Sequence, residues 1–89
     1  MDRKYLETQI YRSLNLYFKT QGVKIPRKLL ERGARQATNW LLGIIEPVKN
    51  EKLRVEIATE LLPKAVDVGV EWCKGLLKIC PKEIIEKIK

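Results

Sequence analysis

Histidine is absent from the sequence, which removes the side chain that most often transfers protons near neutral pH. The five glycines are isolated from one another, so the sequence has no glycine-rich loop of the type that holds nucleotide phosphates. Two cysteines without histidine are too few ligands for a zinc site in one chain. We therefore expect a protein that is not an enzyme and that carries no metal and no cofactor.

Pairs of acidic residues do occur one helical turn apart, at Glu56 with Glu60 and at Asp67 with Glu71. Hard cations usually need more than two oxygen ligands, and lysines flank the second pair. We interpret both pairs as parts of solvated faces, in which exposed ion pairs exchange.

Long apolar runs are also lacking. The longest, residues 40–45, has six residues where a membrane-spanning helix needs about 20. The first residues, Met1 to Tyr5, lead into an amphipathic segment without the apolar core of a signal peptide. We expect a cytoplasmic protein.

The 89 residues suffice for a single domain, 1–89, with a small core. Hydrophobic residues make up 45% of the chain, and the mean hydropathy of −0.26 is typical of a globular protein rather than a disordered one. A surface of Lys, Arg and Glu with abundant Ile and Leu resembles the composition of hyperthermophile proteins. Chance composition is an equally good explanation in so short a chain.

The net charge of +7 and the isoelectric point near 9.6 favour polyanionic partners. This charge is unevenly distributed. Residues 1–45 carry nine basic against three acidic side chains, whereas residues 46–89 carry nine against eight. The excess positive charge therefore lies in the first half.

Prolines at positions 26, 47, 63 and 81 divide the chain into candidate helices, because proline disfavours helix in the residue before it. Helical periodicity predicts a first helix over about residues 2–20, ended by Gly22, and a second from Pro26 to residue 45. Gly33 and Ala37 lie one turn apart on the apolar face of the second, where another helix can approach closely.

The segment that follows is ambiguous, because residues 52–57 alternate polar and apolar as a strand does. We prefer helix, since good helix formers surround it and a lone two-stranded ribbon is marginal. Pro63 predicts a break or a kink, and Leu62, a poor N-cap, slightly favours a kinked continuation over two capped helices. Pro81 starts a final short helix. The sequence thus predicts an all-α, single-domain bundle of about four main helices plus a short C-terminal helix, with antiparallel neighbours.

Residues 63–80 place apolar side chains on more than half of a helix surface, which is wider than packing against one neighbour requires. We therefore predict that this helix is covered on two or more sides, by other helices or by another subunit. The predicted partner-interface residues are Val70, Trp72, Cys73 and Leu77.

Cys73 and Cys80 are two turns apart, and a straight helix separates their Cα atoms by about 10.5 Å. They cannot bond to each other within such a helix. We interpret them as small buried apolar residues, with an intersubunit disulfide or a reactive thiol as the alternative.

Basic residues at one-turn spacing follow one line of the second predicted helix, opposite its apolar face. Such a line can follow a phosphate backbone, and Arg and Asn can also reach base edges. The alternative is an ordinary solvated face. Trp40 and Trp72 lie on apolar faces and are predicted to belong to the core. The candidate nucleic-acid-binding residues are Lys24, Arg27, Lys28, Arg32, Arg35 and Asn39.

Two classes of function are therefore open. The first is a non-catalytic accessory or regulatory protein that binds DNA or RNA. The second is a structural or adaptor protein that acts by self-assembly or by docking on a larger complex, without nucleic acid. A membrane-surface bundle of cationic helices is a third, less favoured class.

Overall fold

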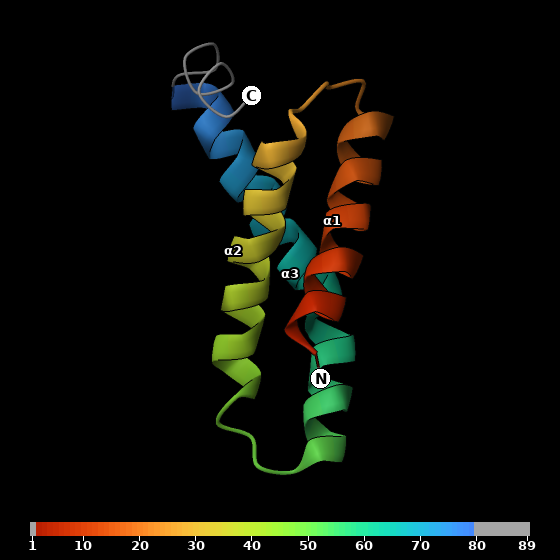
Figure 1. Cartoon of the computed structure of the whole chain (residues 1–89), viewed down its shortest axis with the longest axis vertical. Helices are drawn as coiled ribbons and strands as arrows, with labels where there is room; N and C mark the ends of the chain where they lie inside the picture. Colours follow the sequence, from red (N-terminus) through yellow and green to blue (C-terminus); the bar gives the residue numbers. More distant parts are fainter. Residues whose placement is uncertain (1, 80–89) are drawn as a thin grey trace.

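The computed structural model describes residues 2–79, which form three α-helices: α1 (Arg3–Thr20), α2 (Arg27–Ile45) and α3 (Glu51–Ile79). α1 and α2 lie side by side and antiparallel, and α3 crosses behind both (Figure 1). The all-α prediction is confirmed for these residues, none of which forms a strand. The described range contains three main helices rather than the four that the prolines predicted.

Local sequence sets the ends of α1 as expected. The Asp2 carboxylate accepts a hydrogen bond from the backbone N–H of Lys4 (3.2 Å), which satisfies one unpaired donor of the first turn. Gly22 has a φ of +70°, a conformation that costs glycine little. The backbone N–H of Val23 then reaches the carbonyl of Phe18 (3.0 Å), closing the helix with a Schellman motif.

The starts of α2 and α3 also follow from short signals. The carbonyl of Pro26 accepts from the backbone N–H groups of Leu29 and Leu30, so the proline immediately precedes the first turn of α2. Asn50 precedes α3, and its side-chain oxygen accepts from the backbone N–H of Leu53 (3.2 Å). The connection between α2 and α3 is therefore short and ends in a helix cap.

Of the two outcomes predicted at Pro63, the break is wrong and the continuation is confirmed, because α3 runs through this residue. An interior proline costs a helix about 3 kcal/mol. Thr59, whose carbonyl oxygen has no N–H donor at Pro63, lies on the exposed surface of the helix. Buried residues on both sides of the proline (Ala58 and Ala65) hold the helix against its neighbours. The strand alternative for residues 52–57 is also wrong, since they form the first turns of α3. The short helix expected after Pro81 lies outside the described residues.

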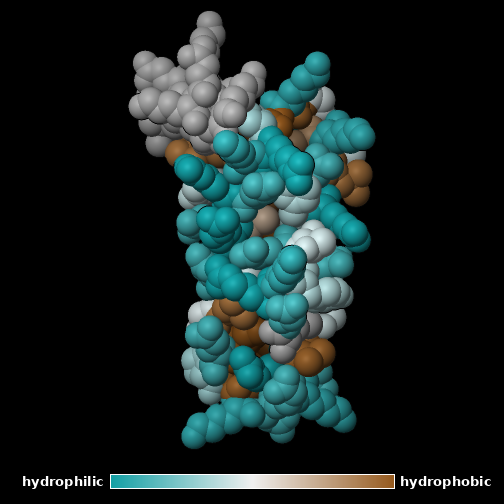
Figure 2. Space-filling model, in the orientation of Figure 1, coloured by the Kyte–Doolittle hydropathy of each residue, from teal (hydrophilic) through white to brown (hydrophobic). Residues whose placement is uncertain are grey.

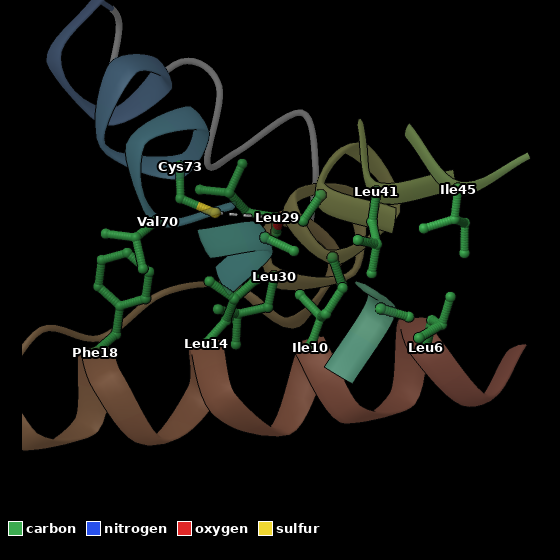
Figure 3. Packing of buried hydrophobic residues seen from close by; sticks show 14 residues of the cluster. Leu6, Ile10, Leu14, Phe18, Leu29, Leu30, Leu41, Ile45, Val70 and Cys73 are labelled. Carbon is green, nitrogen blue, oxygen red and sulfur yellow. Dashed lines mark hydrogen bonds between the residues drawn. The ribbon is translucent and has the colours of Figure 1, made fainter. Parts of the chain in front are cut away.

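One hydrophobic core joins the three helices. α1 contributes a row of four side chains that point to the same side, towards α2 and α3 (Figure 3). The buried members from all three helices are Leu6, Ile10, Leu14, Phe18, Leu29, Leu30, Ala34, Ala37, Leu41, Ile45, Ala58, Ala65, Val70 and Cys73.

α2 and α3 pack closely where Gly33 and Gly69 meet, a contact that we call the glycine crossing. A Cβ atom built on Gly33 would lie 2.6 Å from the Cys73 sulfur, and one built on Gly69 would lie 3.2 Å from the Gly33 carbonyl oxygen. The two methyl groups of Leu14 would each be 3.1 Å from the Gly69 Cβ, so α1 closes the crossing. The close approach predicted at Gly33 is confirmed.

Candidate nucleic-acid interface

The outer surface of α2 carries a line of polar side chains, Lys28, Arg32, Arg35 and Asn39, which we call the basic ridge. All four residues are exposed. Their spacing of three or four residues keeps them on one side of the helix, and Lys28 and Arg35 are about 10.5 Å apart along its axis. Within residues 2–79 no acidic side chain forms an ion pair with the three cations. The positive charge of the ridge is therefore available to a ligand.

Arg27 differs from the ridge cations because it is already paired. Its Nε lies 3.1 Å from Oε1 of Glu31, one turn further along α2. Glu31 is the only acidic residue in α2, so this pair neutralises the one negative charge beside the ridge. Lys24, in the connection before α2, is exposed and extends the positive surface past the start of the helix.

Asn39 has a structural contact that the sequence did not predict. Its side-chain oxygen accepts a hydrogen bond from the Arg3 guanidinium, and Arg3 Nε also contacts Glu7 Oε1 at 3.1 Å. Reading a base edge with both ends of an amide requires a free oxygen as well as a free amino group. Arg3 therefore competes with a base for the Asn39 oxygen, and the contact links the start of α1 to α2.

A hollow of about 380 Å³ lies between α1 and α2, next to the basic ridge, and we call it the α1–α2 groove. A second hollow of about 250 Å³ lies near the connection between these helices and includes Lys19 and Lys24. The α1–α2 groove is lined from α1 by Lys4, Glu7, Thr8 and Tyr11, and from α2 by Arg27, Glu31, Ala34 and Arg35.

Sequence reasoning missed the contribution of α1 to this surface. Lys4 and Lys19 join the cations of α2 because the two helices are antiparallel and packed together. The signal was present in the short connection at 21–26, which brings the end of α1 back beside the start of α2. The whole face is largely hydrophilic, with small hydrophobic areas near its ends (Figure 2).

The outer surface of α3 has a different charge. The helix carries five basic and five acidic residues, so it has no net charge. Four exposed acidic residues share its outer side: Glu56, Glu60, Asp67 and Glu71. The excess positive charge of the three helices therefore lies on the α1–α2 side and not on α3.

The predicted partner-interface residues lie mostly inside the chain. Val70 and Cys73 are 5% and 0% exposed, and the helices that cover them belong to the same chain. Trp72 is half-buried against the core, as is Trp40, in agreement with their predicted core positions. The side chain of Leu77 lies outside the described residues. The wide apolar arc of α3 is thus explained at Val70 and Cys73 without a partner.

Cys73 behaves as the small buried apolar residue that the sequence predicted. Its thiol points towards the carbonyl of Leu29 at 3.7 Å (Figure 3). Burial raises the pKa of Cys73 to about 11, so the thiol is protonated and unreactive near neutral pH. Cys80, the other cysteine, lies outside the described residues.

One cation of α3 contacts an aromatic side chain of α1. Lys74 Nζ donates a hydrogen bond to the Tyr17 hydroxyl (3.0 Å) and lies 5.3 Å from the ring centroid. This hydrogen bond raises the pKa of Lys74 above its usual value. Tyr17 is therefore engaged in holding α1 to α3 and is not free to stack on a base.

No group of three or more potential metal ligands gathers among residues 2–79, and no helix in this range is long and apolar enough to cross a membrane. Comparison with protein-family models, with curated proteins and with solved structures finds no match to this chain. The basic ridge and the groove beside it are therefore the features of the described residues from which a function can be inferred.

Proposed function

We propose that this protein is a non-catalytic, nucleic-acid-associated accessory or regulatory protein that binds phosphates through the basic ridge and Lys24. The observation that carries this proposal is the set of three exposed ridge cations without an acidic partner among residues 2–79. A solvated helix face usually interleaves both signs of charge, whereas the ridge carries only positive charge.

The geometry suits a phosphate backbone. Lys28 and Arg35 are separated by about 10.5 Å along the helix axis, and B-form DNA carries one phosphate per strand about every 3.4 Å along its own axis. Lys28, Arg32 and Arg35 therefore span about three phosphate steps of one strand, so each can reach a separate phosphate without a change in the helix. Contacts of this kind position a protein on nucleic acid and carry no sequence information.

The adaptor alternative has lost part of its support. It depended on the wide apolar arc of α3, but Val70 and Cys73 of this arc are covered by α1 and α2. Among the described residues, the large apolar side chains that stay exposed on α3, Leu53 and Val55, lie in its first turns and outside this arc.

The test is fluorescence anisotropy of a labelled 16-base-pair duplex, titrated with the full chain at several salt concentrations. If Lys24, Lys28, Arg32 and Arg35 neutralise four phosphates, the log–log slope is about 3.6 and affinity falls more than about a hundredfold between 50 and 200 mM salt. Replacing Arg32 and Arg35 together by Ala lowers this slope by about 2.

The matched control removes two charges from the other side of the molecule, as Lys52→Ala with Lys64→Ala on α3. Both lysines are exposed, and the net charge changes equally. We expect this control to keep nearly the affinity and slope of the unmodified protein. Absence of binding at 50 mM salt, or equal weakening by the two double variants, would refute binding through the ridge.

A further inference from the structure

The α1–α2 groove is built from two facing rows of side chains above a small floor. Lys4, Thr8 and Tyr11 follow one line of α1, and Arg27, Glu31 and Arg35 repeat every four residues along α2. Ala34 lies between the rows, 2% exposed, and its side chain ends at Cβ. The longer side chains thus form walls around a hollow of about 380 Å³, within the usual size range of small-ligand sites.

One end of the groove is positively charged. The Arg3 contact to Asn39 shows that the start of α1 lies beside the end of α2, and this antiparallel order brings Lys4 towards Arg35. Neither of these two cations forms an ion pair with another described residue. Glu7 also lines the groove, but its carboxylate is paired with Arg3. The two neighbouring like charges of Lys4 and Arg35 therefore favour an anion such as a phosphate group.

The other end combines an aromatic ring with a carboxylate. Tyr11 is half-buried, because it packs against the core on one side while it lines the groove on the other. Glu31 contacts Arg27 through Oε1, which leaves Oε2 to accept a hydrogen bond. A ring for stacking beside a carboxylate acceptor suits a flat aromatic group that carries N–H donors.

We propose that the α1–α2 groove binds one unpaired nucleobase of a single-stranded nucleic acid, stacked on Tyr11, with the adjoining phosphate held by Lys4 and Arg35. This inference rests on the proposed function, since the basic ridge holds the phosphates on either side. A duplex keeps its bases stacked and paired, and therefore contacts the ridge but does not fill the groove.

The test compares a labelled 16-nucleotide single strand with the duplex of the same sequence, by anisotropy at 50 mM salt. Three proteins are used: the unmodified chain, Tyr11→Phe and Tyr11→Leu. Stacking of one base on an aromatic side chain contributes about 1–3 kcal/mol, and 1.4 kcal/mol corresponds to a tenfold change in affinity. We therefore expect the Leu variant to bind the single strand at least about fivefold more weakly.

Tyr11→Phe is the matched control, because it keeps the ring and removes only the hydroxyl. We expect its single-strand affinity to stay within about twofold of the unmodified chain, since the π-face that stacks is retained. The duplex affinity of all three proteins should be the same. This duplex measurement also shows that the Leu variant is folded and that its ridge is intact.

The outcomes separate this inference from the proposed function. If the duplex and the single strand bind with equal affinity and Tyr11→Leu changes neither, the groove inference is wrong and the ridge proposal stands. If Tyr11→Leu weakens both probes equally, the groove inference is also wrong. If neither probe binds at 50 mM salt, the proposed function fails, and this inference fails with it.

Discussion

The two sides of α2 differ in the size and charge of the side chains that meet a neighbouring helix. Towards α3, Gly33 lets the backbones touch, and a Cβ atom there would collide with Cys73. Towards α1, above the buried row of leucines and isoleucines, long charged side chains leave the α1–α2 groove open. One helix thus has a side on which packing stabilises the fold and a side on which charged groups stay available to a ligand.

Because the two sides of α2 differ in this way, we expect substitutions on one side to change stability and substitutions on the other to change binding. Close-packed interiors respond to a change of a single methyl group, because dispersion contacts and strain are short-ranged. Exposed charges are screened and solvated, so their removal changes the folding equilibrium little, whereas it changes long-range attraction for a polyanion directly. Substitutions on the α3 side of α2 should alter stability, and substitutions on the outer side should alter binding.

The largest expected effect is that of Leu14→Ala, which removes the α1 side chain that closes the glycine crossing. Leu14 is 0% exposed, and truncation of such a residue costs about 2–5 kcal/mol of unfolding free energy. Leu16→Ala on the same helix is the control: Leu16 is 64% exposed, and we expect a change within about 0.5 kcal/mol. Guanidinium unfolding followed by circular dichroism measures both. Similar losses in the two variants would contradict the position of Leu14 in the core.

A smaller effect is expected from adding one methyl group at the crossing. Gly33→Ala places a Cβ atom 2.6 Å from the Cys73 sulfur, and overpacking of this kind costs about 1–3 kcal/mol. The better helix propensity of Ala offsets about 0.5–1 kcal/mol of this cost, so we expect a net loss of up to about 2 kcal/mol. Gly43→Ala is the control on the same helix: a Cβ atom there meets nothing within 4 Å, so better helix propensity raises stability by about 0.5–1 kcal/mol.

A second substitution tests whether contact with the Cys73 sulfur causes the stability loss of Gly33→Ala. Cys73→Ala removes the sulfur that the new methyl group meets, so it should restore part of the stability of Gly33→Ala, with a coupling of about 0.5–3 kcal/mol in a double-mutant cycle. If the two substitutions were simply additive, contact with Cys73 would not be the reason for the loss.

Much of α1 and α2 was predictable because their signals are local. The apolar periodicity of Leu6, Ile10 and Leu14 and the turn at Gly22 depend only on residues within a few positions of one another. The same is true of the ridge, since Lys28, Arg32 and Arg35 share a side of any helix.

Features that depend on which helix covers which surface were not predictable. Pro63 disfavours a helix locally, but buried residues before and after it favour one continuous helix. Tertiary packing outweighs the local preference of the proline. The apolar arc around Val70 and Cys73 has the same sequence pattern whether its cover is another subunit or the chain's own helices. The α1–α2 groove needs Lys4 and Tyr11 to face Arg27 and Arg35, which no single helical period contains.

The smallest expected effect on stability comes from the outer side of α2. Arg32→Ala with Arg35→Ala removes two exposed cations that have no acidic partner among the described residues. We expect the unfolding free energy to change by no more than about 0.5 kcal/mol, because surface substitutions away from caps and buried groups rarely do more. Alanine is also a good helix former and relieves repulsion within the ridge.

The same double variant is the one that should lose affinity for nucleic acid, so guanidinium unfolding and anisotropy on one preparation test both the stability and the binding side of the comparison. A loss of more than about 1 kcal/mol would mean that these arginines support the fold, and the separation between the two sides of α2 would not hold.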